Sequence, residues 1–216
     1  HTSLIEEILS LVSHISDISN LTLDPVLDSY YLMDIAIVKL PPTLEYTEQS
    51  RTLGTGVLVK KSMTPDEKLK LGLLYGTIKS AIDSVNKGIQ VAFNYNPDIK
   101  PKLEGAVKDY IAKANSFLEV LDKRIINASV IDMDSKEYFS LSTATIDAGF
   151  KLDAEGLLVL NSLLEKRIKD ISAKRSLIIF ITVITFLALT YLFIGFYISV
   201  IEALKKMQGS MEKIAD

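Results

Sequence analysis

Residues 176–201 read SLIIFITVITFLALTYLFIGFYISVI, a run of 26 residues without a single charged side chain. About 20 apolar residues in an α-helix are enough to cross the hydrocarbon core of a lipid bilayer. Helices in soluble cores seldom stay apolar on every face over such a length. The run therefore predicts a transmembrane helix. It divides the chain into a body (residues 1–175), a span (176–201) and a C-terminal segment (202–216).

The charges beside this span do not settle its orientation. Five basic residues precede it closely and three follow it: Lys166, Arg167, Lys169, Lys174 and Arg175 before, and Lys205, Lys206 and Lys213 after. The positive-inside rule alone would place the body in the cytoplasm, but that rule is weak for long translocated domains. We place the body on the extracytoplasmic side because of the order of segments described below.

The composition limits the classes of partner. The chain has 216 residues and a formal net charge of -3, and its Lys and Arg are spread along the sequence without forming a basic stripe. We therefore expect no nucleic-acid partner. The chain has no cysteine, so an extracytoplasmic body must gain its stability from helix packing and not from disulfides.

The body carries the periodicity of helices. Apolar residues recur mostly at three- and four-residue steps in three stripes: Leu4, Ile5, Ile8, Leu9, Val12, Ile15 and Ile18; then Leu69, Leu73, Ile78, Ile82, Val85, Ile89 and Phe93; then Val107, Ile111, Ala114, Leu118 and Leu121. A last helix, capped near residues 132–135, continues into the span. No segment alternates with period two between hairpin turns. The sequence predicts an all-α fold, an elongated antiparallel four-helix-type bundle whose last helix continues into the membrane.

Turn and proline signals divide these helices. We expect chain reversals near residues 61–65, 95–101 and 129–134. Pro41 and Pro42 should break or kink a helix that starts after Pro25. If a membrane helix precedes His1, the chain must reverse an odd number of times before the span, so the breaks at 20–25 and 41–42 should be both kinks or both reversals. Helix lengths favour two reversals or a folded-over short helix at 26–40. Residues 20–42 then form an irregular insert, and binding sites favour such segments.

The insert also concentrates polar groups, in SNLTLDPVLDSYYLMD (residues 19–34). Carboxylates suit a cation or amine, and tyrosines supply walls and hydroxyl groups. The alternative is local, with the acids capping helices and the tyrosines packing on neighbours. Arg51 either faces the same pocket and holds an anionic ligand or forms an ordinary ion pair. The candidate ligand-binding residues are Asn20, Asp24, Asp28, Tyr30, Tyr31, Asp34 and Arg51.

Catalytic patterns are absent from the sequence. The only histidines are His1 and His14, and His14 has no cysteine or histidine partner nearby. No phosphate-binding glycine loop and no nucleophile elbow occurs, and the acids of the insert lack the spacing of a calcium loop. We expect no enzyme activity, no cofactor and no metal site.

Two stretches resemble known receptor families. Residues 200–216, VIEALKKMQGSMEKIAD, are amphipathic and resemble the first helix of a HAMP linker, whose typical ending is matched by Ile214, Ala215 and Asp216. The proline-leucine often found early in that helix is Ala203-Leu204 here. Residues 19–34 are similar to the sensor regions of methyl-accepting chemotaxis proteins and of related membrane-bound kinases and diguanylate cyclases.

The resemblance implies a transmembrane receptor that binds a small molecule with a periplasmic domain. It implies a homodimer in the inner membrane, a second span upstream of His1, and cytoplasmic signalling proteins reached through an output module beyond Asp216. Chemotaxis is the output we expect first. A histidine kinase or diguanylate cyclase output, and a ligand-free structural bundle tethered to the membrane, stay open as alternatives.

Overall fold

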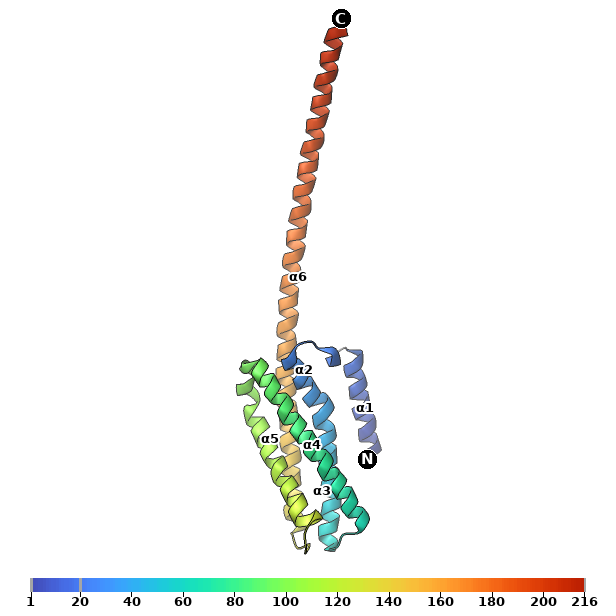
Figure 1. Ribbon diagram of the computed structural model, residues 1–216, viewed down its shortest axis with the longest axis vertical. Coiled ribbons are helices and arrows are strands. Elements are labelled where there is room, and N and C mark those ends of the chain that lie inside the picture. The colour runs from blue at the N-terminus through green and yellow to red at the C-terminus, as the bar shows by residue number, and fades with distance from the viewer. Residues whose placement is uncertain (1, 20, 216) are drawn as a thin grey trace. The chain divides into compact units, whose positions relative to one another are not determined.

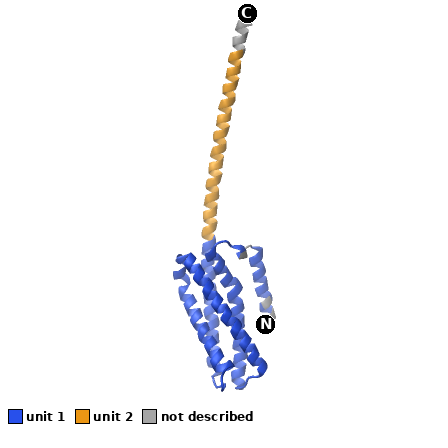
Figure 2. Cartoon of the chain, in the orientation of Figure 1, with its two compact units in different colours: residues 1–164 blue, residues 165–216 orange. Residues whose placement is uncertain are grey.

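The computed structural model describes residues 2–19 and 21–215, with side chains at all of these positions except 2, 3, 6, 22 and 208–215. Every regular element in this part of the chain is a helix, which confirms the all-α prediction. The chain forms two compact units, residues 1–164 and residues 165–216, which are treated separately below (Figure 2).

The elements follow one another with short connections. They are α1 (Thr2–Ile18), the 3-10 turn η1 (Leu21–Leu23), α2 (Leu27–Met33), the π-helical η2 (Asp34–Lys39), α3 (Leu40–Lys60), α4 (Pro65–Tyr95), the 3-10 turn η3 (Pro97–Ile99), α5 (Lys100–Val120), the π-helical η4 (Leu121–Ile126) and α6 (Ser135–Ala215).

In the first unit four rods run side by side, and consecutive rods point in opposite directions (Figure 1). They are α2–η2–α3, α4, α5–η4 and the first part of α6, and α1 lies beside the rod that contains α3. One apolar core links all four rods, with Leu71 and Ile89 of α4, Leu103 and Phe117 of α5, and Tyr138 of α6 among its fully buried members.

Of the two expectations for Pro41 and Pro42, a break is wrong, because helical residues continue without interruption through both prolines. The preceding turn η2 is π-helical, and the Leu40 N–H donates to the carbonyl of Ile35, five residues back. The α-helical hydrogen-bond register restarts at Leu40, so the prolines occupy the first positions of α3. Proline is tolerated there because the first N–H groups of a helix lack intrahelical acceptors.

The three expected reversals are confirmed, and of the two breaks in the insert only the one at residues 19–26 is a reversal, which gives four reversals in place of the odd number expected. α3 ends at Lys61 in the left-handed region (φ 53°). α4 begins with a capping box in which Thr64 and Glu67 satisfy each other's backbone N–H groups. The breaks at 20–25 and 41–42 are thus of different kinds, so the irregular insert is limited to the loop before α2 and to η2.

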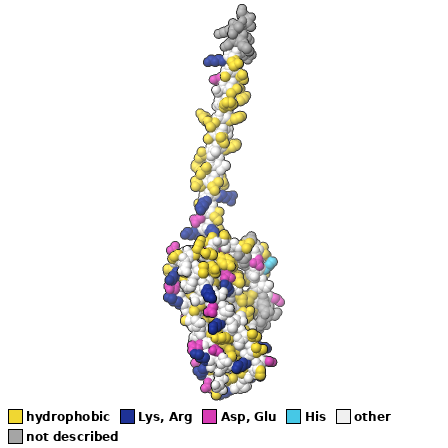
Figure 3. Space-filling view, viewed as in Figure 1, with side chains coloured by type: hydrophobic (Ala, Val, Ile, Leu, Met, Phe, Trp, Pro, Cys, Tyr) yellow, Lys and Arg dark blue, Asp and Glu magenta, His cyan; other side chains and the backbone are white. Residues whose placement is uncertain are grey.

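The second unit contains the part of α6 with the uncharged run. No residue in its most apolar window is buried within the molecule, and the helix is long and apolar enough to cross a membrane. Figure 3 shows its apolar side chains between basic side chains near each end. The hydroxyls of Thr182, Thr185 and Thr190 donate to carbonyls four residues back, at 2.8–2.9 Å. These polar groups are therefore satisfied without water, as a lipid environment requires.

Candidate functional site

Asp24 and Asp28 have local structural roles in the loop before α2 and at its first turn. Asp24 Oδ1 accepts a hydrogen bond from the Val26 N–H at 3.0 Å. Asp28 is 5% exposed, and its carboxylate accepts from the Ser29 N–H and from the Asn96 side-chain amide, both at 2.7 Å. This second bond joins the start of α2 to the end of α4. Both Asp28 oxygens are engaged within the protein, which favours a local structural role. The expected cap is not found, because the N-cap of α2 is Val26 and no side chain bonds to the first turn from that position. Asn20 lies outside the described residues.

Tyr30, Tyr31 and Asp34 also pack or pair locally. The two tyrosine rings meet edge to face with centroids 5.3 Å apart. Tyr31 lies close to α4, where a Cβ added to Gly88 would be 3.1 Å from its ring. Asp34 forms an ion pair with Lys39 within η2 (2.5 Å). Packing of the tyrosines against the core and a local ion pair account for these three residues.

Arg51 lies far along the rod from Asp28. It lies 23 residues after Asp28 on the continuous α2–η2–α3 rod, which corresponds to about 35 Å at helical rise. Of the two alternatives for Arg51, a place in the same pocket as Asp28 is therefore excluded. A helix that runs on through Pro41 and Pro42 separates the two ends of the rod, whereas a fold-back would have joined them.

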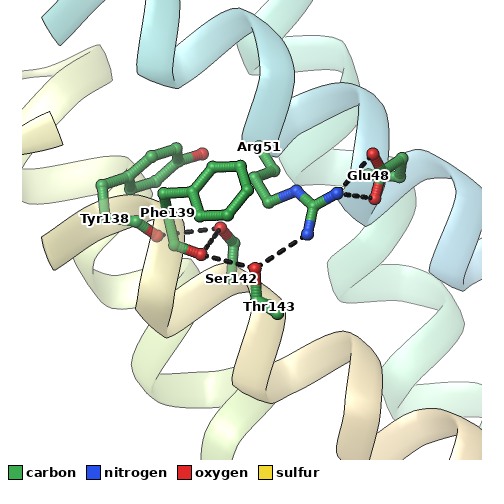
Figure 4. A network of polar contacts seen from close by, with 6 residues as sticks. All are labelled: Glu48, Arg51, Tyr138, Phe139, Ser142 and Thr143. Atoms are coloured by element: carbon green, nitrogen blue, oxygen red, sulfur yellow. Dashed lines mark hydrogen bonds and ion pairs between the residues drawn. The ribbon is translucent and has the colours of Figure 1, made fainter. Parts of the chain in front are cut away.

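Arg51 instead connects α3 to α6 (Figure 4). Its guanidinium donates to both carboxylate oxygens of Glu48 at 2.5 Å and to the Thr143 hydroxyl at 2.7 Å. Its Cζ lies 4.5 Å from the centroid of the Phe139 ring, a cation–π distance. The Arg51 Nε is buried and has no hydrogen-bond partner. The ion pair of the second alternative thus exists, and the same guanidinium also contacts Thr143 and Phe139 of α6.

A second contact between α3 and α6 is made by Ser50 and Tyr138, the residues that precede Arg51 and Phe139. The Tyr138 hydroxyl donates to the backbone carbonyl of Ser50 at 3.0 Å and lies 3.3 Å from the Ser50 hydroxyl. A Cβ added to Gly54 would be 2.6 Å from the Tyr138 ring, so α3 has room for this ring only because residue 54 lacks a side chain. Burial raises the pKa of the Tyr138 hydroxyl, which therefore stays protonated and able to donate.

We call this contact the α3–α6 seam. The residues that meet across it are Leu44, Ser50, Arg51 and Gly54 on α3, and Tyr138, Phe139, Thr143 and Gly149 on α6. Buried hydroxyl-bearing residues of the same two helices, Thr43, Thr47 and Ser142, lie at helical spacing from these. Most of its hydroxyls bond within their own helix: Thr47 donates to the Thr43 carbonyl and Ser142 to the Tyr138 carbonyl, both at 2.8 Å. Such bonds survive when one helix shifts along the other.

Two grooves with three lining residues in common lie along α3 near the seam. The first, about 350 Å³, is walled by apolar residues of α1, α3 and α6 with two acids on its rim: Ile5, Leu9, Pro41, Leu44, Ile146 and Phe150, with Glu45 and Glu48. The second, about 760 Å³, shares Ile5, Glu45 and Glu48 and adds Glu67. Apolar walls with carboxylates suit a cationic ligand that has an apolar body. Glu48 belongs both to these grooves and to the Arg51 network.

A third groove lies between α4 and α5. It measures about 540 Å³, with Phe93 and Val107 buried among its lining residues and with exposed amides and lysines, including Asn86, Gln90 and Lys108. The Lys108 ammonium is already paired with Glu104 at 2.7 Å. This groove offers hydrogen bonds to a polar ligand but has no contact with α6.

Sequence reasoning missed most of the groove residues. Glu45, Ile146 and Phe150 carry no motif. The one signal in the sequence, not used above, is the three-residue spacing of Glu48 and Arg51, which suits a local ion pair on a helix. Their convergence depends on how α1, α3 and α6 pack. Asp153 was also missed: its Oδ1 is buried without a partner, and desolvation raises its pKa to about 6.

The described residues, 2–19 and 21–215, contain no group of three or more His, Cys, Asp or Glu placed to hold a metal ion. Comparison of the chain with protein-family models, with curated proteins and with solved structures gives no match.

Proposed function

We propose that this chain is the sensor part of a transmembrane signalling receptor, with residues 1–175 outside the cytoplasm and chemotaxis as the output. One observation carries the proposal: the helix α6 is unbroken from Ser135 to Ala215. It contains both a face buried in the first unit and the run long and apolar enough to cross a membrane. A displacement of one end of such a helix is passed to the other, because a helix resists compression along its axis.

The α3–α6 seam supports a sensing role. Large apolar side chains would hold α6 in one register, whereas small and hydroxyl-bearing residues allow more than one packing. A ligand shifts an equilibrium between two packings only if it binds them with different affinity. The groove lined by Ile146 and Phe150 of α6 meets that requirement, because its shape depends on where α6 lies. We place the ligand there and not at Asp28.

Glu48 gives the groove a direct connection to α6. It lines the groove and also holds the guanidinium of Arg51, which donates to Thr143. A cationic ligand that takes one Glu48 oxygen competes with Arg51 for that carboxylate. The released guanidinium then changes the contact of α3 with Thr143 and Phe139, so ligand charge is converted into a shift at α6.

The relay beyond the span rests on the sequence pattern. Ile201, Leu204 and Met207 begin an apolar stripe that continues at Met211 and Ile214, whose side chains lie outside the described ones. Such a stripe suits a parallel helix partner, as in a HAMP linker. We propose that a homodimer carries this stripe to an output module and through it to cytoplasmic signalling proteins.

Topology is the first thing to test. The chain has no cysteine, so a single one introduced at Ser116 or at Lys205 is a unique probe. Both side chains are exposed. In intact cells, a membrane-impermeant maleimide should label the variant at 116 and leave the variant at 205 unlabelled until the membrane is opened. The reverse pattern would overturn the extracytoplasmic placement.

Signalling is tested in a chimera that joins the chain through Ala215 to the relay and output modules of a reporter receptor. We expect Arg51→Ala to shift the basal output because it removes the bonds to Glu48 and Thr143. The matched control is Lys123→Ala, which removes an exposed ion pair to Glu119 between residues that line neither of the two grooves. Equal output from both variants, together with no response to any ligand pool, would favour a structural bundle.

A further inference from the structure

The groove between α4 and α5 has no part in the proposed function. Its lining residues recur at helical spacing on the end of α4 and the start of α5, two antiparallel helices joined by η3 (Figure 1). They are Asn86, Gln90 and Phe93 on α4, and Lys100, Glu104, Val107, Lys108, Ile111 and Ala112 on α5. From residue 100 to residue 111 the groove follows α5 for about 16 Å at helical rise. We call it the α4–α5 groove.

The floor of the α4–α5 groove is apolar and held in place by the core. Phe93 and Val107 are 5% and 4% exposed, and Ile111 is half-buried. The first two belong to the apolar core of the unit, and Ile111 packs against it. A floor of this kind exists before any ligand arrives, and it favours a ligand whose apolar part displaces water from it.

The rim of the α4–α5 groove carries hydrogen-bond donors that the protein itself leaves unused. The side chains of Asn86, Gln90 and Lys100 are exposed. Within residues 2–19 and 21–215, none of these three side chains forms a hydrogen bond or an ion pair. Lys100 acts on Glu104 only through its charge, which helps to lower the pKa of that carboxyl after the larger effect of Lys108. Two amides and one ammonium are therefore open to a ligand.

The charges of the lining residues select the sign of that ligand. Glu104 is the one acid among them, and its carboxylate is held by the Lys108 ammonium at 2.7 Å. These two charges cancel, so Lys100 leaves the groove with one positive charge. A ligand with a single negative charge complements it. A carboxylate has one such charge at neutral pH, whereas a phosphate monoester carries closer to two.

We infer that the α4–α5 groove binds a small organic carboxylate that has an apolar body, such as an arylacetate. The Lys100 ammonium holds the carboxylate, and the apolar body covers Phe93 and Val107. The amides of Asn86 and Gln90 are left to bond polar substituents on that body. The inference goes beyond the proposed function and does not depend on it, because the grooves along α3 suit cations whereas this one suits anions and is lined by α4 and α5 alone.

Calorimetric titration of the 216-residue chain in non-ionic detergent micelles tests the ligand class. The probe is phenylacetate. Acetate, which lacks the ring, and 2-phenylethanol, which lacks the charge, are the controls. We expect phenylacetate to bind at least about fivefold more tightly than either control, since it alone uses both the floor and Lys100. Equal affinity for 2-phenylethanol would show that the ring partitions without a charge partner. Equal affinity for acetate would show that the floor is not used. Either result overturns the inference.

Substitutions on the rim locate the bound probe. Lys100→Gln removes the positive charge and should weaken phenylacetate binding about fivefold. Lys102→Gln is the matched control, because Lys102 is also exposed and lies outside the groove. Gln90→Glu keeps the size of the side chain but adds a negative charge, and it should abolish binding. All three positions are exposed, so we expect unchanged melting temperatures without the probe. Equal affinity of Lys100→Gln and Lys102→Gln would overturn the inference.

Glu48→Gln separates this site from the grooves along α3. Phenylacetate binding should be unchanged in this variant, because Glu48 is not among the residues of the α4–α5 groove. If Glu48→Gln abolishes phenylacetate binding while Lys100→Gln does not, the probe lies in the other groove and the present inference fails. If phenylacetate behaves as expected but the cation 2-phenylethylamine does not bind, the ligand site of the proposed function fails and the α4–α5 site stands.

Discussion

Helix α3 packs against α4 on one side and against α6 on another, and the two contacts are built differently. α4 contributes large aliphatic side chains that are at most 2% exposed: Leu71, Ile78, Ile82, Val85 and Ile89. The α3–α6 seam instead contains Gly54, Gly149, serines and threonines around the Tyr138 and Arg51 cross-links. The same helix thus has one contact dominated by burial and another dominated by close approach and a few specific bonds.

This difference suggests how one small bundle can be stable while one of its helices keeps more than one packing position against its neighbour. Interlocked aliphatic side chains give each helix one favoured register, because a shift opens voids. Hydroxyls that bond within their own helix do not fix the position of α6 along α3. That position then depends on the Arg51 and Tyr138 contacts, and we expect these few bonds to break and re-form at low cost. We therefore expect mutations on the α4 side to act on stability, and mutations in the seam to act on stability less and on signalling more.

The largest loss is expected from Ile89→Ala, on the α4 side. Ile89 is 1% exposed, and removal of its side chain leaves a cavity in the core. The free energy of unfolding should fall by about 2–5 kcal/mol. The control is Leu73→Ala on the same helix, where the side chain is 64% exposed and the change should stay within about 0.5 kcal/mol. Denaturant unfolding of the chain in detergent micelles, followed by circular dichroism, measures both; equal losses would contradict the assigned core.

A smaller effect is expected where the helices approach most closely. Gly54→Ala places a methyl group 2.6 Å from the Tyr138 ring and should lower the free energy of unfolding by about 1–2 kcal/mol. Gly56 lies two residues away with open space around it, so Gly56→Ala should raise stability by up to about 1 kcal/mol through helix propensity. The same unfolding assay applies. Opposite signs are the expected outcome, and a gain in both would show that Tyr138 is not packed against α3.

The Tyr138 hydroxyl contributes less than the ring. Tyr138→Phe keeps the packing but leaves the Ser50 carbonyl without this donor, which should lower the free energy of unfolding by about 1 kcal/mol. Tyr95→Phe is the matched control, since Tyr95 is 53% exposed. In the reporter chimera, Tyr138→Phe should also shift basal output. An unchanged output together with a normal loss of stability would restrict Tyr138 to a structural role.

The smallest effect concerns pH and Asp153 of α6. Desolvation raises its pKa to about 6, above the ordinary value of an aspartate, so the folded state favours the protonated form. The stability it contributes is complete below the ordinary pKa and is lost as pH rises through about 6. The melting temperature should therefore increase between pH 7.5 and pH 5.

Asp153→Asn should reduce this pH dependence, whereas Asp147→Asn, at an exposed position of the same helix, should leave it unchanged. Glu67 does not interfere in this range. The bond with Lys60 and the capping bond at Thr64 lower its pKa to about 2, so its contribution is lost only as pH falls below about 4.5 toward 2. If the melting temperature of Asp153→Asn and that of the unmodified chain change with pH by the same amount, the Asp153 carboxyl is solvated and the prediction fails.

Sequence periodicity predicted much of the body and misplaced part of it. The α5 stripe is mostly buried as expected, including Val107, Ala114 and Leu118. At the start of α4, however, Leu69 and Leu73 are exposed and Leu71 is buried. A stripe of period 3.6 is ambiguous near a helix end, where few residues define its phase. The partners available to each face decided that phase, and the sequence does not show them.

The candidate site also shows which features the sequence predicts and which depend on packing. Residues 19–34 drew attention because polar groups are rare in an apolar bundle, yet Asp28 bonds to Asn96, 68 residues away, and is fully engaged. The grooves beside the seam were not predicted, because Leu9, Glu48 and Phe150 come from three helices that only packing brings together. Each of these residues alone is ordinary for its helix.

The sequence by itself determined that the chain is helical and that residues 176–201 suit a membrane, because helical periodicity and an uncharged run of that length are local properties. Only the tertiary structure decided that Pro41 and Pro42 lie inside a continuous rod, since the π turn before them supplies the register change that the prolines need. That rod separates Arg51 from Asp28 and brings Arg51 against α6. There it bonds to Thr143, 92 positions further along the chain, a contact that no local pattern encodes.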